Sequence, residues 1–511
     1  MGQMAPENLV RVTSSSAELS EAINSMFEWY QEAEVCLVFL PDMPSPGDIS
    51  RDLPRCRWFT RGWTLQELLA PGAVWFFDSA WEFMGEKRDR ALRHLIINIT
   101  AIPESLLAGS AGLSDYSNSV RMSWAANRQT TRVEDIAYCL MGIFDIKMPL
   151  IYGEGKKAFQ RLQEEIVKSS DDASIFAWTG KADGWGAPLY SGIYAESPAQ
   201  FEHSDHPPLR DAIVHGISVT NRGIHIRISL GVSYSTAEAN TYTYVLRLGR
   251  VYDARGHPTT LGIYLRQVGP GYFVRYFPEQ LPRFETALLF KSLIEDIYIA
   301  TAIPPSVSRH PVGGYIEHTS TNYVGSLGSA LKFLLHDGMM LTDCYPTRNW
   351  DMQDQCFFTN SPSGLDWATF CVSGRVQVGP ASFPREEVDL NLMCICFNWN
   401  GATETKPIHG LIINRNLHSV QSQVMMHLYL KDVDVEQEAN LLIMRGLGAA
   451  APEVMVNCVP KDPARAASPR KAKVRLMFNK IQDAARPEDN RGRMTTSVWL
   501  DVQPENGSEV D

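Results

Sequence analysis

The chain has 511 residues, of which 44% are hydrophobic and 21% are charged, and its formal net charge is −11. These proportions are typical of a globular chain with about two to four domains, and they exclude an intrinsically disordered protein. Acidic residues outnumber basic ones by 58 to 47, which argues against nucleic acid as the main partner.

The cysteine pattern indicates the compartment. Nine cysteines are scattered along the chain, mostly within apolar runs. This usage is typical of reduced core thiols in an intracellular protein, and no Cys/His spacing of the zinc-site type accompanies it. No apolar run reaches the ~18 residues that a membrane span needs. We therefore expect a cytoplasmic protein with no membrane span and no bound metal.

The first third of the chain predicts alternating helices and strands. Apolar residues follow helical spacing over Leu19–Tyr30. Val35–Leu40 and Ala73–Phe77 are short continuous apolar runs, which indicate buried, parallel strands. From 119 to 170 the pattern is helical, with one helix expected over Val133–Phe144. This order predicts an α/β sheet with crossover helices.

Beyond Trp178 the pattern changes to that of strands. Apolar residues alternate with polar ones over Ile224–Leu230, as in a half-buried strand. Similar runs lie at Thr241–Leu248, Gly262–Val268, Tyr272–Tyr276, Asp296–Ala300, Leu390–Phe397, Gly410–Asn414, Val424–Leu430, Asn440–Met444, Val474–Phe478 and Thr495–Val502. Strands separated by Gly, Pro and Asn turns predict antiparallel sandwiches or barrels.

We therefore predict an α/β domain at 14–178 and a linker with a short helical segment at 179–208. Two β-rich domains are expected at 209–305 and 320–505, separated by a stretch rich in Pro, Ser, Gly and Thr over Pro304–Asn322.

The segment Arg55–Pro71 gathers two tryptophans, three arginines and one carboxylate. Trp63 and Glu67 are four residues apart, so on a helix they share one face. With Arg57 and Arg61 they would suit a nucleotide or a sugar phosphate. The alternative is an ordinary buried corner in which Glu67 complements its helix dipole or pairs with Arg61.

The loop after the predicted helix Val133–Phe144 carries a short glycine motif. Tyr152–Gly155 is expected to be a turn, with Glu154 capping the next helix. The run Gly153–Lys157 lacks the first glycine and the terminal hydroxyl of a phosphate-binding loop, so it does not predict nucleotide binding.

Several motifs in chain order closely resemble the fungal heterokaryon-incompatibility (HET) domain. They are Arg61–Pro71, Arg121–Ala126, Thr131–Leu140, Met148–Gly155 and Asp171–Trp178. The resemblance implies a role in fungal non-self recognition and programmed cell death. It also implies protein partners or self-association through this domain.

The HET domain is itself similar to the Toll/interleukin-receptor (TIR) fold. In TIR domains that cleave NAD, the glutamate of a Trp-x-x-x-Glu helix start is catalytic, and this resemblance carries that role onto Glu67. NAD is then the substrate, Trp63 would stack on a ring of NAD, and Arg57 or Arg61 would hold phosphate. No other cofactor is implied. The implied fold is an incomplete TIR/flavodoxin-like parallel sheet with helices, followed by the mainly antiparallel β region.

Arg121 and Trp124 are further candidates for this site, since they lie in one of the HET-like motifs. The alternative for them is a buried network of arginines and carboxylates, including Glu134 and Asp135, that holds the helical half onto the sheet.

One departure from the family affects the expected activity. HET domains open with two strands and their motifs, whereas here the match starts at Ser14–Leu19 and Met1–Thr13 resembles neither motif. An amino-terminally truncated domain would lose part of any nucleotide site, because ligands sit at the carboxyl ends of central strands. Two functions stay open: an effector that acts on NAD through Glu67, and a non-catalytic interaction protein with a degenerate HET domain. Whether the chain is an enzyme stays open with them.

Overall fold

The computed structural model describes residues 16–180 and 189–204 as continuous segments. Further along it describes 214, 216–228, 230–235, 241–252, 257–284, 290–291, 296–303, 330–334, 339–345, 347–352, 356–357, 367–378, 386–397, 409–414, 450–451, 453–459, 471–482 and 494–504. The predictions for Met1–Thr13, Pro304–Asn322, Val424–Leu430 and Asn440–Met444 lie outside the described residues.

The chain begins with a small α/β sheet. Helix α2 (Ser16–Glu32) leads to strand β1 (Cys36–Phe39), and helix α4 (Thr64–Leu69) leads to strand β2 (Val74–Phe77). β1 pairs with β2 in parallel, and β3 (Phe83–Glu86) pairs with the other edge of β2 in antiparallel orientation. The predicted α/β fold with a parallel strand pair is therefore confirmed, and β3 adds an edge strand that was not predicted.

The two parallel strands bury one face only. Cys36, Val38 and Phe76 are buried, whereas Leu37 and Trp75 are exposed. The prediction that these strands are buried is therefore wrong for one face of the sheet. A continuous apolar run normally indicates a strand covered on both faces. Here the run is the same, but in the part of the chain that the structure describes no helix covers the outer face.

Short helices connect these elements and continue the α/β region. Between β1 and α4 lie α3 (Ile49–Asp52), η1 (Leu53–Arg55) and η2 (Arg57–Thr60). After β3 come α5 (Arg90–Thr100), α6 (Glu104–Leu107), η3 (Leu113–Asp115), α7 (Asn118–Ser123), α8 (Asp135–Tyr138), η4 (Met141–Ile143), α9 (Lys157–Ser169) and η5 (Ala173–Phe176).

The predicted helix Val133–Phe144 is wrong in its extent. Glu134 takes the N-cap position of α8, and the chain leaves the helix after Tyr138 before forming η4. This break lets Gly142 pack directly on α2, where an added Cβ would lie only 2.2 Å from the Cβ of Phe27. The helical pattern predicted up to residue 170 is confirmed at its end by α9.

The segment after Trp178 forms a ten-stranded sheet, as its alternating pattern predicted. Its strands are β4 (Tyr190–Ser191), β5 (Ser218–Thr220), β6 (Gly223–Arg227), β7 (Gly231–Ser235), β8 (Thr241–Tyr252), β9 (Pro258–Gly269), β10 (Tyr272–Tyr276), β11 (Arg283–Phe284), β12 (Phe290–Lys291) and β13 (Asp296–Ile299). All described pairs are antiparallel except β10 with β13. The short helix η6 (Pro198–Phe201) lies between β4 and β5.

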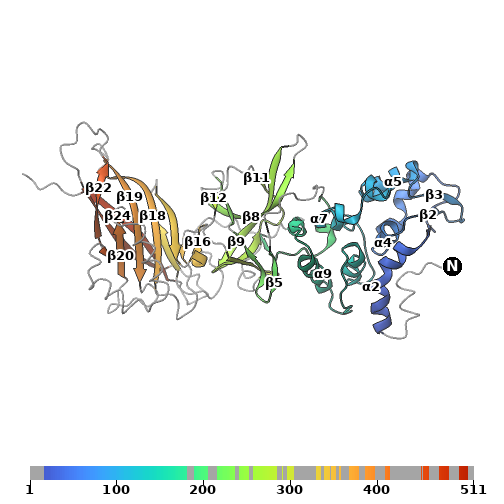
Figure 1. Cartoon of the computed structure of the whole chain (residues 1–511), viewed down its shortest axis with the longest axis horizontal. Helices are drawn as coiled ribbons and strands as arrows, with labels where there is room; N and C mark the ends of the chain where they lie inside the picture. The colour runs from blue at the N-terminus through green and yellow to red at the C-terminus, as the bar shows by residue number, and fades with distance from the viewer. Residues whose placement is uncertain are drawn as a thin grey trace, which may run out of the picture.

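An eleven-stranded sheet follows. It contains β14 (Ala330–Leu334), β15 (Met339–Tyr345), β16 (Trp350–Asp351), β17 (Cys356–Phe357), β18 (Trp367–Val378), β19 (Glu386–Phe397), β20 (His409–Asn414), β21 (Ala450–Ala451), β22 (Glu453–Val459), β23 (Lys471–Gln482) and β24 (Met494–Pro504). The short helix η7 (Thr347–Asn349) precedes β16. β14 and β24 are parallel, and the other described pairs are antiparallel. Both large sheets have open strand orders among their described strands, and Figure 1 shows them following the α/β region along the long axis.

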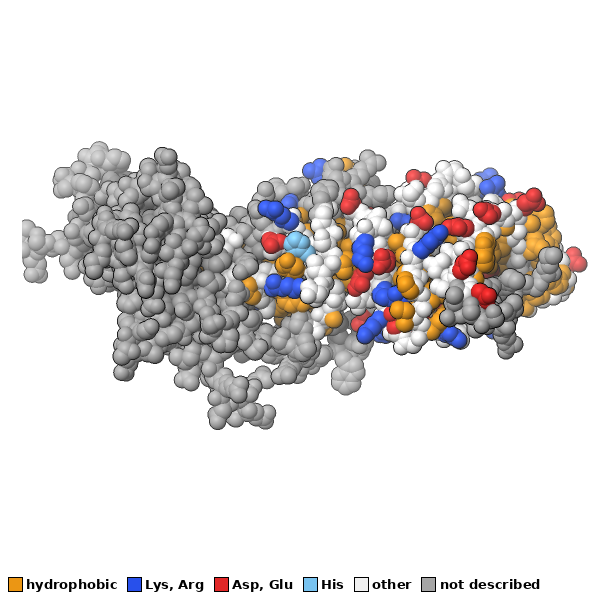
Figure 2. All heavy atoms as spheres, turned by 60° about the horizontal axis from the view of Figure 1, so that its bottom comes forward, with side chains coloured by type: hydrophobic (Ala, Val, Ile, Leu, Met, Phe, Trp, Pro, Cys, Tyr) orange, Lys and Arg blue, Asp and Glu red, His pale blue; other side chains and the backbone are white. Residues whose placement is uncertain are grey.

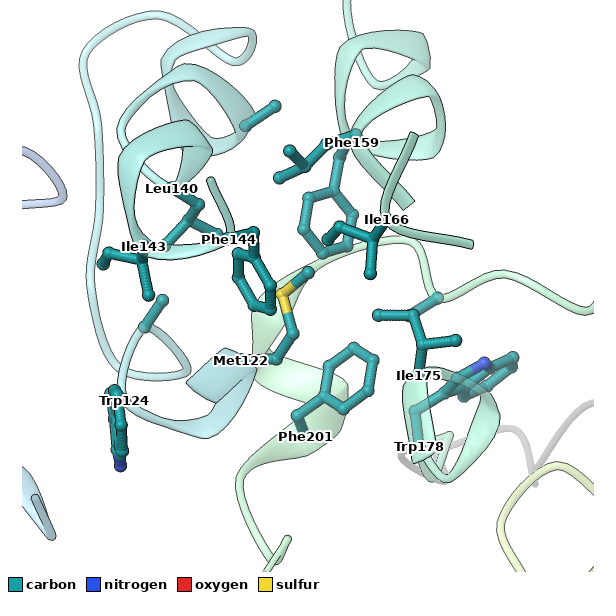
Figure 3. Close-up of a cluster of buried hydrophobic side chains, with 14 of the residues drawn as sticks. Met122, Trp124, Leu140, Ile143, Phe144, Phe159, Ile166, Ile175, Trp178 and Phe201 are labelled. Atoms are coloured by element: carbon teal, nitrogen blue, oxygen red, sulfur yellow. The ribbon is translucent and has the colours of Figure 1, made fainter. Parts of the chain in front are cut away.

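One buried apolar cluster runs from α2 through the helices into the ten-stranded sheet. Met122, Phe144 and Phe201 point toward one another at its centre, although they come from α7, the end of η4 and η6 (Figure 3). Arg275 of β10 also joins the two regions. Its fully buried guanidinium donates to the backbone carbonyls of Phe176, at 2.8 Å, and Trp178, and it lies 3.8 Å from the centre of the Trp178 ring.

No helix within the described residues has both the length and the apolar content needed to cross a membrane.

Candidate functional site

Glu67 lies in the first turn of α4, beside two aromatic side chains from other elements. The indole Nε1 of Trp58 donates to its Oε2 at 3.1 Å. The hydroxyl of Tyr30, near the end of α2, lies close enough to the carboxylate for each group to shift the pKa of the other. The sequence prediction missed both partners, because neither Trp58 nor Tyr30 stands at helical spacing from Glu67.

The surroundings of Glu67 disfavour its charge. Part of the side chain is exposed, but protein atoms surround the carboxyl group, and this burial raises the pKa of Glu67. The Trp58 hydrogen bond and the positive charge of Arg61 oppose that shift without cancelling it. The nearby Cys36 thiol is buried and faces the Glu67 charge, so its pKa rises to about 12. Cys36 is therefore a protonated core thiol and not a nucleophile.

The indole of Trp63 lies beside the carboxylate of Asp135 and is not among the groups that act on Glu67. The Asp135 carboxylate accepts a hydrogen bond from the hydroxyl of Tyr152 at 3.0 Å. Two of the residues predicted to form one site with Glu67 therefore differ. The positive charge of Arg61 acts on the Glu67 carboxylate, whereas Trp63 lies beside Asp135 of α8. Four-residue spacing did not bring the two side chains together, although the backbone of Trp63 is itself helical.

The other candidates have partners of their own. Arg57 is exposed and forms an ion pair with Asp42 at 3.6 Å. Arg121 donates to the side chain of Asn118 at 2.6 Å and to the carbonyl of Ile143 at 3.1 Å. Trp124 packs edge-on against Tyr116, with 5.4 Å between ring centres. The structure does not gather these three residues around Glu67.

A groove of about 1090 Å³ lies near Arg121. Its walls come from the end of α2, the turn after α4, the loop from α6 to α7, and the end of α9. Arg88, Lys87 and Arg121 contribute positive charge, and Asp171 and Asp172 contribute negative charge. Glu67 is not among the lining residues, so the predicted catalytic carboxylate and this groove are separate places.

Lys87 is a structural residue of that groove. Its Nζ donates to the carbonyls of Leu68, at 3.0 Å, and Pro71, at 2.5 Å, just beyond the end of α4. Burial lowers the pKa of Lys87 to about 8. These bonds satisfy carbonyls that the helix end leaves without partners.

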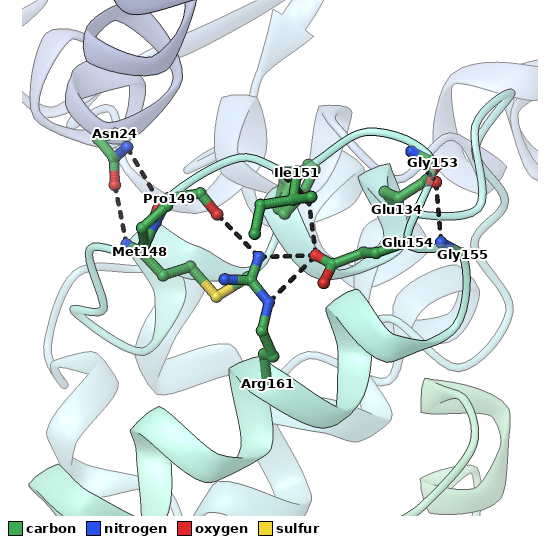
Figure 4. A network of polar contacts seen from close by, with 10 residues as sticks. Asn24, Glu134, Met148, Pro149, Ile151, Gly153, Glu154, Gly155 and Arg161 are labelled. Carbon is green, nitrogen blue, oxygen red and sulfur yellow. Dashed lines mark hydrogen bonds and ion pairs between the residues drawn. The ribbon is translucent and has the colours of Figure 1, made fainter.

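The glycine motif forms a closed polar network (Figure 4). Glu134 Oε1 accepts from the backbone N–H groups of Gly153, at 2.8 Å, and Gly155, at 3.0 Å, and backbone hydrogen bonds of this kind lower the pKa of Glu134. Glu154 pairs with Arg161 of α9 at 2.6 Å. The prediction that Glu154 caps the next helix is therefore wrong: Lys156 is the N-cap of α9, and Glu154 binds a side chain further along it.

Within the described residues, no group of three His, Cys, Asp or Glu side chains is placed to hold a metal ion.

We expect Glu67→Gln to stabilise the fold at neutral pH. The folded pKa of Glu67 lies above its ordinary 4.5, so the wild type loses stability as the pH rises from 4.5 through the folded pKa. The variant does not titrate. Its advantage in free energy of unfolding should therefore be absent at about pH 3, where the carboxyl is protonated in both states, and grow as the pH rises through 4.5.

Urea denaturation across this pH range measures the difference. Glu21→Gln, at an exposed position of α2, is the matched control and should show no such growth. A Glu67→Gln variant less stable than the wild type at every pH would contradict the expectation.

Together, these observations define an α/β unit with a buried carboxylate and a separate mixed-charge groove, joined to large, mainly antiparallel sheets. Over 170 residues the chain is 50% identical to the vegetative incompatibility protein HET-E-1 of Podospora anserina. The match covers 32% of this chain and 12% of that protein. The likeness supports a protein related to heterokaryon incompatibility.

A family model described as a domain of unknown function, DUF8212, matches residues 157–204, from α9 to η6. This match does not confirm a HET domain. No solved structure matches the chain.

Proposed function

We propose that this chain takes part in fungal vegetative incompatibility, and that its α/β region acts there by binding protein. The observation that carries the role is the 50% identity over 170 residues to a vegetative incompatibility protein. Because the chain spans only 12% of that relative's length, the proposal concerns this role and not the relative's other activities.

The geometry at Glu67 favours binding over catalysis. A carboxylate that assists cleavage of a nicotinamide–ribose bond has to contact the sugar. Here the carboxylate accepts a hydrogen bond from Trp58, has the Tyr30 hydroxyl beside it, and does not line the groove. A role in holding α2 and η2 onto α4 accounts for these contacts.

NAD cleavage through Glu67 is the second candidate. It is favoured by the raised pKa of Glu67 and by the Trp58 ring and Arg61 charge beside it. This candidate requires the folded protein to open around Glu67 when NAD binds. It also requires new contacts for four residues that have other partners here: Arg57, Trp63, Arg121 and Trp124.

One experiment separates the two candidates. Purified wild type and Glu67→Gln are incubated with NAD, and nicotinamide release is followed; both are also expressed from an inducible promoter in a filamentous fungus. We expect neither protein to release nicotinamide above the level of a protein-free blank. We expect cells that express either protein to stop growing and to take up a dye that enters only dead cells.

Release by the wild type that is lost in Glu67→Gln would establish the NAD candidate instead. Normal growth of cells that accumulate the intact wild-type chain would contradict the proposed role in vegetative incompatibility.

A further inference from the structure

The outer face of the three-stranded sheet carries six apolar side chains. Leu37 lies opposite Trp75, Phe39 lies opposite Phe77, and Phe77 lies opposite Phe83. Trp81, in the turn between β2 and β3, stacks on Phe39 with 4.4 Å between ring centres. We call this set the aromatic face; its members are Leu37, Phe39, Trp75, Phe77, Trp81 and Phe83.

The aromatic face is open to solvent. Leu37 is 51% exposed, Trp75 40%, Trp81 56% and Phe83 57%. The rings touch one another, with 5.9 Å between the centres of Trp75 and Phe83, so the exposed area is continuous. Figure 2 shows hydrophobic side chains gathered at the end of the molecule where Figure 1 places β2 and β3.

Trp81 is held in an unfavourable backbone conformation. Its φ is 63°, in the left-handed region that a bulky side chain rarely adopts. Asp78 stabilises this turn, since its Oδ1 accepts from the N–H groups of Ala80 at 2.9 Å and Glu82 at 3.0 Å. The strained residue carries a large indole that is 56% exposed, and strain of this kind is concentrated at binding sites.

The exposed area fits a contact between two copies. With about 150–250 Å² per aromatic side chain, the exposed fractions amount to roughly 400–500 Å² of apolar surface on each chain. Two such faces would bury about 1,000 Å², which is the apolar share of a standard interface of about 1,600 Å².

We propose that the aromatic face binds the same face of a second copy of this chain, in a two-fold symmetric dimer. Among the outward positions of the three strands, Glu86, opposite Trp75, is the charged residue. A face with one acidic corner has no positive charge for an anionic lipid surface, whereas an apolar face is complementary to itself. The dimer rests on the protein-binding role proposed above, because the second copy would be the protein that the α/β region binds.

Sedimentation velocity of the full chain over about 1–100 µM tests the dimer. We expect a reversible dimer for the wild type. Phe83→Glu and Trp81→Gly should each raise the dissociation constant at least about tenfold, because an aromatic anchor is lost. Trp81→Gly also relieves the positive φ, so this variant should fold at least as stably as the wild type.

Two control variants make comparable changes at positions outside the aromatic face. Ala101→Gly relieves a φ of 54° outside the face, and Trp29→Ser removes a tryptophan that is 51% exposed on α2. Both should dimerise as the wild type does.

A wild type that stays monomeric throughout would overturn the proposal, and so would a dimer that survives both face variants. Binding of a monomeric wild type to phosphatidylcholine vesicles, lost in Phe83→Glu, would assign the face to a membrane and overturn it too. The growth assay is read separately, so a monomeric protein that still arrests growth overturns the dimer and not the proposed function.

Discussion

Arg275→Met should destabilise the fold by about 3–5 kcal/mol, because it leaves two buried carbonyl groups without donors. The Arg275 guanidinium is fully buried and binds the carbonyls of Phe176 and Trp178 while stacking on the Trp178 ring. Burial lowers the pKa of Arg275 to about 9, so the side chain is still charged at neutral pH. The variant also avoids the cost of burying a charge, which offsets part of the loss in free energy of unfolding. The stated range already includes this offset.

Urea denaturation followed by tryptophan fluorescence measures the effect. Arg275→Lys should lose about half as much free energy of unfolding as Arg275→Met. Its single ammonium group cannot reproduce the planar guanidinium that reaches both carbonyls. Arg227→Met, at an exposed position of β6, is the control and should stay within about 0.5 kcal/mol of the wild type. A loss below about 1 kcal/mol for Arg275→Met would mean that desolvation of the charge cancels its hydrogen bonds.

Gly142→Ala should cost about 2–4 kcal/mol although it adds a single methyl group. The new Cβ would lie 2.2 Å from the Cβ and 2.5 Å from the Cγ of Phe27, so η4 and α2 would have to separate. Since a Cβ is fixed to its backbone, rotation of the Phe27 ring cannot relieve the clash.

Thermal and urea unfolding measure this change as well. Gly72→Ala is the matched control: no atom lies within 4 Å of the added Cβ, and the substitution should be neutral or slightly stabilising. Equal stability of the two alanine variants would show that α2 moves away from η4 at little cost.

The fold class could be predicted because it depends on local patterns. Continuous apolar runs marked β1 and β2, and alternation marked β6. The exposure of Leu37 and Trp75 could not be predicted. A strand with one open face and a strand covered on both faces can have the same continuous run of apolar residues. The sequence likewise contains no local signal that Gly142 must approach Phe27 and interrupt a helix.

The candidate site was predicted less well, for a related reason. Glu67 was singled out, but its neighbours Trp58 and Tyr30 come from elements brought together only by tertiary packing. Helical spacing selected Trp63 in their place, although its indole lies beside Asp135. Spacing within one helix describes neighbours along that helix and says nothing of side chains that arrive from others.

The bonds from Gly153 and Gly155 to Glu134 have a consequence for how this loop responds to anions. Convergent backbone N–H groups in a turn can form a receptor for phosphate or sulfate. Here the receptor already holds an anion that is covalently tethered, and an intramolecular ligand has an effective concentration of at least the millimolar range. Free phosphate therefore has to displace the Glu134 carboxylate before it can bind here, and this carboxylate ties the start of α8 to the loop that precedes α9.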